Sequence, residues 1–247
     1  MAELESQLRP VLANQPSDGI VLLLGVTPEL SNLVLDVLQL RLIAADRSLP
    51  MIRSIWASSS PHSAVVQADW RHLPIASNTA VAVIGDGCFT TIGFPEDYRQ
   101  VLNAISLALK PGGIFTMRFF VSPVIAEKPD KVFADLYAGA IENFHIFKWR
   151  LAMALLDRNT WSIPVHCIWQ SWRDAVAAPD DLAQHLGWPV SVVNTIDAYR
   201  DAPAIYSFPT LPVLLEILSE QFNVVANFTP AYELGDRCPT IILRKKE

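Results

Sequence analysis

The sequence lacks the residue patterns that build a disulfide framework, a metal centre or a basic surface. Its three cysteines, Cys88, Cys167 and Cys238, are odd in number and show no C-x-x-C spacing, so neither disulfides nor a cysteine zinc site is indicated. Five scattered histidines lack H-x-x-x-H spacing, and we expect no metal site. The 19 basic and 25 acidic residues give a net charge of -6, which disfavours a broad nucleic-acid surface.

Long apolar runs and a basic N-terminus are also missing. No run approaches the roughly 18 apolar residues that a membrane-spanning helix needs. The first six residues, Met-Ala-Glu-Leu-Glu-Ser, carry acid where a signal peptide carries base. These absences predict a cytoplasmic protein without a membrane partner. The 51% hydrophobic content indicates a compact, well-buried chain instead.

Up to residue 121 the sequence alternates between strand and helix patterns. The helix expected over 95–109 is the clearest, since apolar residues form one stripe and Lys110-Pro111-Gly112-Gly113 ends it. The other expected elements are strands over 20–24, 42–45, 64–68, 81–84 and 114–121 and helices over 28–39 and 49–56. Five strands with helices between them predict a parallel sheet with right-handed crossovers.

The alternation breaks after Pro123 and resumes near Leu211. Residues 126–204 show helical stretches without clear strand alternation, and they hold five of the seven tryptophans. A helix over 211–221 and two closing strands, 223–228 and 240–244, follow. We therefore predict one α/β domain over 1–121 and 205–247 with a helical, Trp-rich insertion over 122–204. The insertion is a candidate substrate lid, because a cover over the strand ends would exclude water from a bound substrate.

The most informative local pattern is a buried strand that ends in a glycine turn at Gly25. Thr27 and Pro28 then fit an N-cap and a first helical position. Asp46 closes the next expected strand, so a glycine turn, a helix start and a carboxylate come together as in crevices that hold adenosine-containing ligands. The turn is not a G-x-G-x-x-G fingerprint, because Thr27 and Leu30 replace the second and third glycines.

The ordered motifs resemble those of class I S-adenosylmethionine-dependent methyltransferases over about 20–121. They are Leu24-Gly25, Asp46, Gln67-Ala68-Asp69-Trp70 with Leu73-Pro74, Ile84-Gly85-Asp86-Gly87 and Leu109-Lys110-Pro111-Gly112-Gly113. The resemblance implies a doubly wound, mostly parallel seven-stranded sheet of the Rossmann-like methyltransferase fold with an antiparallel last strand. The sequence departs from the family pattern at three positions. Leu23 stands where the family usually has an acidic residue, and Thr27 and Glu29 stand where it usually has glycines.

The resemblance also implies roles for individual residues in binding S-adenosylmethionine. The turn would face the methionine portion, Asp46 would accept from the ribose hydroxyls, and Met51 would lie near the adenine. Asp69 would accept from the adenine amino group beside Trp70, and Asp86 would border the methyl donor and the acceptor. The implied cofactor-binding residues are Gly25, Val26, Thr27, Pro28, Asp46, Met51, Asp69, Trp70, Asp86 and Gly87.

In the insertion, Tyr137, His145 and Arg150 are polar enough to line a pocket for a small-molecule acceptor. No residue stands out as a general base, and in-line methyl transfer depends chiefly on alignment. Two alternatives stay open: a non-catalytic cofactor-binding or interaction protein, which the incomplete glycine turn would suit, and a nicotinamide-dependent oxidoreductase, which would need the two absent glycines. The sequence indicates neither the acceptor nor the oligomeric state.

Overall fold

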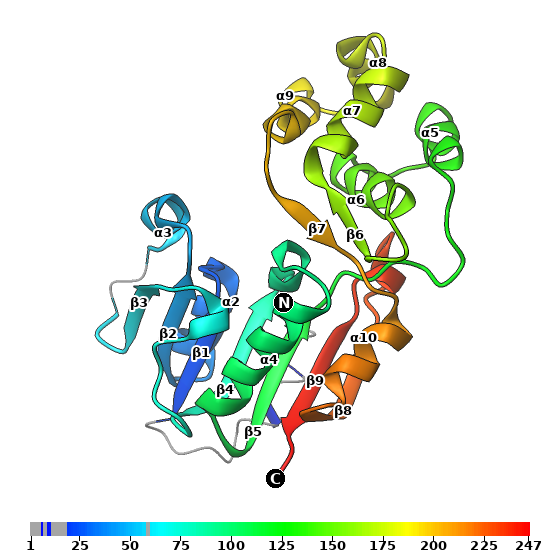
Figure 1. The fold of residues 1–247 in the computed structure, drawn as a ribbon. Helices are drawn as coiled ribbons and strands as arrows, with labels where there is room; N and C mark the ends of the chain where they lie inside the picture. Colours follow the sequence, from blue (N-terminus) through cyan, green and yellow to red (C-terminus); the bar gives the residue numbers. More distant parts are fainter. Residues whose placement is uncertain (1–5, 7–8, 11–18, 58–59) are drawn as a thin grey trace.

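A computed structural model describes residues 6, 9–10, 19–57 and 60–247. The acidic segment at residues 1–5 lies outside this part. A seven-stranded sheet with the order β3-β2-β1-β4-β5-β9-β8 forms the centre of the structure (Figure 1). The strands are β1 (Ile20–Leu24), β2 (Arg41–Asp46), β3 (Ser63–Gln67), β4 (Ala80–Asp86), β5 (Leu109–Arg118), β8 (Phe222–Phe228) and β9 (Thr240–Lys245).

The strand directions confirm the predicted topology. β1 to β5 pair in parallel, while β9 pairs antiparallel with both β5 and β8. Parallel strands connected in this way need a crossover, and helices supply it on both faces of the sheet. The last strand of the sequence is therefore the antiparallel one, as the resemblance implied.

Helices pack two hydrophobic layers against the sheet. α4 (Glu96–Ala108) and α10 (Leu211–Leu218) cover one face, in a cluster that includes Leu22, Phe115 and Leu243. α2 (Pro28–Asn32) and the π-helical turn Leu33–Val37 cover the other face with Val21 and Leu23, joined by α3 (Leu49–Ile55). β1 and β4 are buried along almost their whole length, because layers cover both of their faces.

Three local predictions need correction. The helix expected over 28–39 changes to π-helical hydrogen bonding at Leu33, and Gln39 then turns into the left-handed region with a φ of 54°. The fifth strand begins at Leu109, where it pairs with Ala80, and not at Ile114. Residues 110–113 form an irregularity in that strand, with a φ of +70° at Gly112, so they do not separate helix from strand as predicted.

The segment between β5 and α10 forms a second layer of structure. It lies beyond the carboxyl end of β5 and the start of β9 (Figure 1). Its elements are α5 (Pro129–Tyr137), α6 (Phe144–Ala154), β6 (Ser162–Pro164), α7 (Val165–Ala175), α8 (Pro179–Leu186), α9 (Val190–Val193), the 3₁₀ helix Asn194–Tyr199 and β7 (Ile205–Ser207). β6 and β7 pair antiparallel, a two-stranded sheet that the sequence analysis missed. A separate hydrophobic cluster around Phe144, Phe147 and Trp172 holds the helices together.

Candidate functional site

The glycine turn, β2 and β4 meet at the carboxyl edge of the sheet. Gly25 follows β1 with a φ of +93°, a conformation that a side chain would strain. Its N–H donates to the Ala45 carbonyl at 2.8 Å. A Cβ built on Gly25 would lie 3.8 Å from Cys88 Sγ and 4.0 Å from Asp46 Oδ2. The structure therefore brings together Gly25, Asp46 and the residues that follow Asp86.

Asp46 presents a half-buried carboxylate beside this turn. Its Oδ1 accepts from the Ser48 N–H at 2.7 Å, which fixes the side chain at the start of α3. Among the described residues, Oδ2 has no hydrogen-bond or ion-pair partner. A carboxylate oriented by one oxygen and free at the other can accept from a pair of ligand hydroxyls.

Cys88 is a structural neighbour of the site and not a nucleophile. Its Sγ donates to the Leu24 carbonyl at 3.0 Å, which links the residue after β4 to the end of β1. Burial raises the pKa of the thiol to about 12, so the thiolate that attacks an electrophile is absent near neutral pH.

The helix that begins after the turn lacks the predicted side-chain cap. Thr27 occupies the N-cap position and Pro28 begins α2, as predicted, but the Thr27 side chain makes no capping hydrogen bond. Its backbone carbonyl accepts from the Ser31 hydroxyl at 3.1 Å instead. Val26 is 3% exposed and packs into the core, so only its backbone can face a ligand.

We expect Thr27→Val to change the free energy of unfolding by less than about 0.5 kcal/mol, because no side-chain cap is lost. A side chain that does cap provides the comparison. Asn143 at the start of α6 accepts from the N–H groups of His145 and Ile146, so Asn143→Ala should cost about 1 kcal/mol. Urea denaturation of both variants measures the difference, and an equal loss in the two would contradict the absence of a cap at Thr27.

Asp69 and Trp70 are held by other protein groups. Both Asp69 oxygens accept from the Arg71 guanidinium, and Arg71 also pairs with Asp97 at 3.1 Å. The hydrogen bond from Arg71 lowers the pKa of Asp69 to about 2. The Trp70 indole N–H donates to the Ala45 carbonyl at 2.6 Å, which ties this turn to the end of β2. Met51 lies on the first turn of α3 and is 47% exposed.

Asp86 ends β4 opposite Arg118, its register partner at the end of β5. The guanidinium donates to both carboxylate oxygens, at 2.6 and 2.7 Å, and also to the Tyr232 hydroxyl at 3.1 Å. Burial disfavours the charge on Arg118, but Asp86 outweighs that effect and raises the pKa of the guanidinium. Gly87, with a φ of +67°, lies so close to Phe120 that a Cβ would approach the ring to 2.8 Å.

Arg118 and Phe120 border the candidate site, beside Asp86 and Gly87, and the sequence analysis missed both. A usable signal was present, because an arginine at the end of the fifth strand lies beside an aspartate at the end of the fourth when the two strands are parallel neighbours. Phe120 connects the candidate site to the insertion, because the centroid of its ring lies 4.7 Å from that of Trp149 on α6. Trp149 in turn lies 5.5 Å from Tyr206 on β7.

We expect Arg118→Met to lower the free energy of unfolding by about 1 kcal/mol. The substitution keeps an apolar stem against Phe120 but leaves Asp86 without its bidentate donor, and partial exposure of the pair limits the cost. Arg118→Lys keeps the charge and loses the two-pronged geometry, so it should fall between the wild type and Arg118→Met in urea denaturation. Identical stability of all three proteins would contradict a role for this pair in holding the ends of β4 and β5.

The three insertion residues proposed for the acceptor each contact different groups in the described structure. The Tyr137 hydroxyl donates to the Ala175 carbonyl at 2.7 Å. Arg150 is 11% exposed and pairs with Glu127 and Asp135, while Glu127 also pairs with Arg237 from the β8–β9 connection. His145 is exposed at the start of α6, and desolvation with the nearby Lys148 charge lowers its pKa. Arg150 thus belongs to a charged network that joins the insertion to the sheet.

Two absences concern the described residues alone. Within that part of the chain, no group of three or more His, Cys, Asp or Glu side chains is placed to hold a metal ion. None of the helices in the same part has the length and hydrophobicity that crossing a membrane requires.

Comparisons with known proteins agree with this fold. Residues 24–117 match the family model Methyltransf_11, described as a methyltransferase domain. No curated protein matches the chain. A Methanosarcina mazei protein described as a S-adenosylmethionine-dependent methyltransferase is 14% identical, with a TM-score of 0.57 over 96% of this chain and 97% of that one. Residues 24–117 therefore match a methyltransferase domain, and the chain shares the fold of S-adenosylmethionine-dependent methyltransferases, which confirms the predicted resemblance.

Two further solved structures show how far the fold extends. The 1,6-didemethyltoxoflavin-N1-methyltransferase of Burkholderia thailandensis, solved with bound 1,6-didemethyltoxoflavin and S-adenosylhomocysteine, is 15% identical, with a TM-score of 0.54 over 98% of this chain and 76% of that one. A Rhodobacter sphaeroides protein described as a zinc-dependent alcohol dehydrogenase is 8% identical, with a TM-score of 0.61 over 97% of this chain and 89% of that one. At such low sequence identities the similarity shows only the fold, and the reaction has to be inferred from the residues of the site.

Proposed function

We propose that the chain binds S-adenosylmethionine at the carboxyl ends of β1, β2 and β4 and transfers its methyl group to a small-molecule acceptor. The main observation behind the proposal is that the glycine turn at Gly25 lies directly beside the Asp46 carboxylate. The left-handed glycine leaves the ligand side of the turn free of a side chain. Asp46 Oδ2, which has no partner within the described part of the chain, lies 4.0 Å from where a Cβ would stand. A bare backbone beside a carboxylate suits a nucleoside.

Each residue has a distinct part in this proposal. Asp46 accepts from the ribose hydroxyls, the turn at 25–28 faces the methionine portion, and exposed Met51 covers one side of the adenine. Trp70 holds the end of β2 through its bond to Ala45. The adenine role predicted for Asp69 would require the nucleobase amino group to share the carboxylate with Arg71.

The bound sulfonium would supply an activated methyl group, and the chain would align the acceptor with it. Asp86 and Gly87 border that position from the end of β4, and Arg118 keeps the Asp86 carboxylate fixed. The Phe120–Trp149 pair leads from Gly87 into the insertion, so we place the acceptor beside these rings and propose 122–204 as its cover. Alignment at a contact distance, with water excluded, is the main contribution such a site makes to methyl transfer.

Ligand-dependent stability separates this function from its alternatives. S-adenosylhomocysteine at about a hundred times its Kd should add about 2.7 kcal/mol to the free energy of unfolding, a rise in Tm of roughly 5 to 10 °C. NAD at the same concentration should leave Tm unchanged. The opposite pattern would identify a nicotinamide enzyme. Stabilisation without release of S-adenosylhomocysteine from S-adenosylmethionine, across a panel of small nucleophiles, would favour a binding protein.

A further inference from the structure

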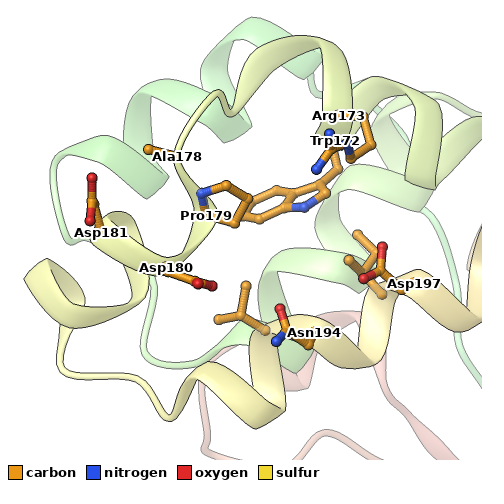
Figure 2. Close-up of a pocket in the computed structure, with 10 residues that line it drawn as sticks. Trp172, Arg173, Ala178, Pro179, Asp180, Asp181, Asn194 and Asp197 are labelled. Atoms are coloured by element: carbon orange, nitrogen blue, oxygen red, sulfur yellow. The ribbon is translucent and has the colours of Figure 1, made fainter.

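A cavity of about 410 Å³ lies in the insertion between the end of α7, the start of α8 and the segment from α9 into the following 3₁₀ helix. Figure 1 places these elements at the end of the insertion farthest from the sheet, away from β1 and β4. The volume falls in the range of small-molecule sites. Its lining includes Trp172, Arg173, Asp180, Asp181, Asn194 and Asp197 (Figure 2).

Trp172 presents an indole N–H to this cavity that no described protein group accepts from, although the side chain as a whole is buried. The side chain is 2% exposed, and its ring is held by Phe144 and Phe147, each with ring centroids 5.3 Å away. Figure 2 shows the indole lying across the cavity, with Asp180 and Asn194 on the opposite side. Among the described residues, its Nε1 has no hydrogen-bond acceptor, although buried indole N–H groups usually find one.

Three other indoles have the hydrogen-bond acceptor that Trp172 lacks, whereas Trp56, Trp149 and Trp161 have none among the described residues. Trp70 donates to the Ala45 carbonyl at 2.6 Å, Trp169 donates to Asp197 Oδ1 at 2.9 Å, and Trp188 donates to the Glu142 carbonyl at 3.3 Å. All three are more exposed than Trp172. The most buried of the described tryptophans therefore directs an unused donor into a cavity, which points to an acceptor atom supplied from outside the chain.

The charge of the cavity indicates what else that molecule carries. Three carboxylates line it against the single guanidinium of Arg173. Asp197 is shared with Trp169 and Arg200, but within the described chain Asp180 and Asp181 form no ion pair. The last turn of α7 adds the partial negative charge of its carbonyl end. The N-terminus of α8 offsets part of this field, and the remaining charge still favours a cation.

We propose that this cavity binds a small organic cation that also carries a hydrogen-bond-accepting oxygen. The cationic group pairs with Asp180, with Asp181 adding negative charge at the edge of the cavity, and the oxygen accepts from Trp172 Nε1. Asn194 offers an amide that can bond to either part. This second site is separate from the proposed methyl-transfer site and does not depend on it.

L-argininamide is a suitable probe, because it combines cationic groups with a carbonyl oxygen, whereas spermidine is a cation without one. We expect calorimetry to show that the full chain binds L-argininamide at submillimolar Kd and more tightly than spermidine. Trp172→Phe, which keeps a ring and removes the donor, should weaken L-argininamide about fivefold to tenfold and leave spermidine unchanged. Addition of the probe should also shift the ¹⁵N–¹H resonance of the Trp172 indole.

A second variant does not alter the buried core. The double substitution Asp180→Asn and Asp181→Asn should weaken both probes about tenfold or more, while Asp201→Asn, on an exposed turn outside the cavity, should change neither. Absence of L-argininamide binding, equal affinity in the double variant, or an indole resonance that does not move would overturn the proposal. S-adenosylhomocysteine affinity, measured on the same variants, should stay constant whichever result is found.

Discussion

Replacement of Asp46 by alanine is expected to weaken the binding of S-adenosylmethionine about 10- to 100-fold. Hydrogen bonds to a charged group contribute about 1.5–3 kcal/mol, and each 1.4 kcal/mol corresponds to a factor of ten in Kd. The Asp46 carboxylate lies at the end of β2 with one oxygen fixed by Ser48. It therefore needs little reorganisation to accept from a ribose, and most of the interaction would be lost on truncation.

Two further variants separate the charge from the geometry. Asp46→Asn retains an oxygen that can accept from the Ser48 N–H, so it should preserve the start of α3 and still lose most of the affinity. Asp201→Asn makes the same change of charge on an exposed turn and should bind as the wild type does. Calorimetric titration with S-adenosylhomocysteine gives the three Kd values. Unchanged affinity in a folded Asp46→Ala protein would exclude this carboxylate from the cofactor site.

The fold could be predicted because its signals are local. β1 and β4 are continuous apolar runs, as strands buried on both faces must be. The stripe over α4 and the two closing strands were likewise evident in the sequence. The π-helical turn after Asn32 and the irregularity at 110–113 were not, because both depend on backbone pairing: Leu38 bonds back to Leu33, and Leu109 pairs with Ala80 before the strand registers shift.

The partners of the site residues were harder to predict than their positions. Strand ends placed Asp46 and Asp86 at one edge of the sheet. For Asp69, the sequence offered Arg71 two residues later as a local partner but did not show whether the two side chains pair. In the structure, the Asp69 carboxylate accepts from Arg71. The Asp86 carboxylate accepts from Arg118, 32 residues away along the chain. Polarity alone likewise suggested Arg150 as a pocket residue, whereas its charge is balanced by two carboxylates within the insertion.

Phe89→Ala is expected to lower the free energy of unfolding by about 3–5 kcal/mol, the range for truncating a fully buried aromatic side chain. Phe89 is 1% exposed and lies directly after Cys88, where the chain leaves the site. Its ring meets Tyr98 edge-on at 4.8 Å and lies 5.1 Å from Phe119. It therefore joins α4 to the end of β5 beneath the proposed cofactor position.

The Phe89→Ala substitution should also affect the candidate cofactor site. Because Phe89 anchors the short helix that presents Cys88 to the end of β1, its loss should also loosen the contact between Cys88 and Leu24 and reduce S-adenosylhomocysteine affinity in the fraction that stays folded. Leu107→Ala, on the exposed face of α4, removes apolar atoms that are 54% exposed and should cost less than about 0.5 kcal/mol. Urea denaturation of both variants, with and without S-adenosylhomocysteine, compares them directly. A loss at Phe89 no larger than that at Leu107 would mean that the layer beneath the site is packed differently from the structure described.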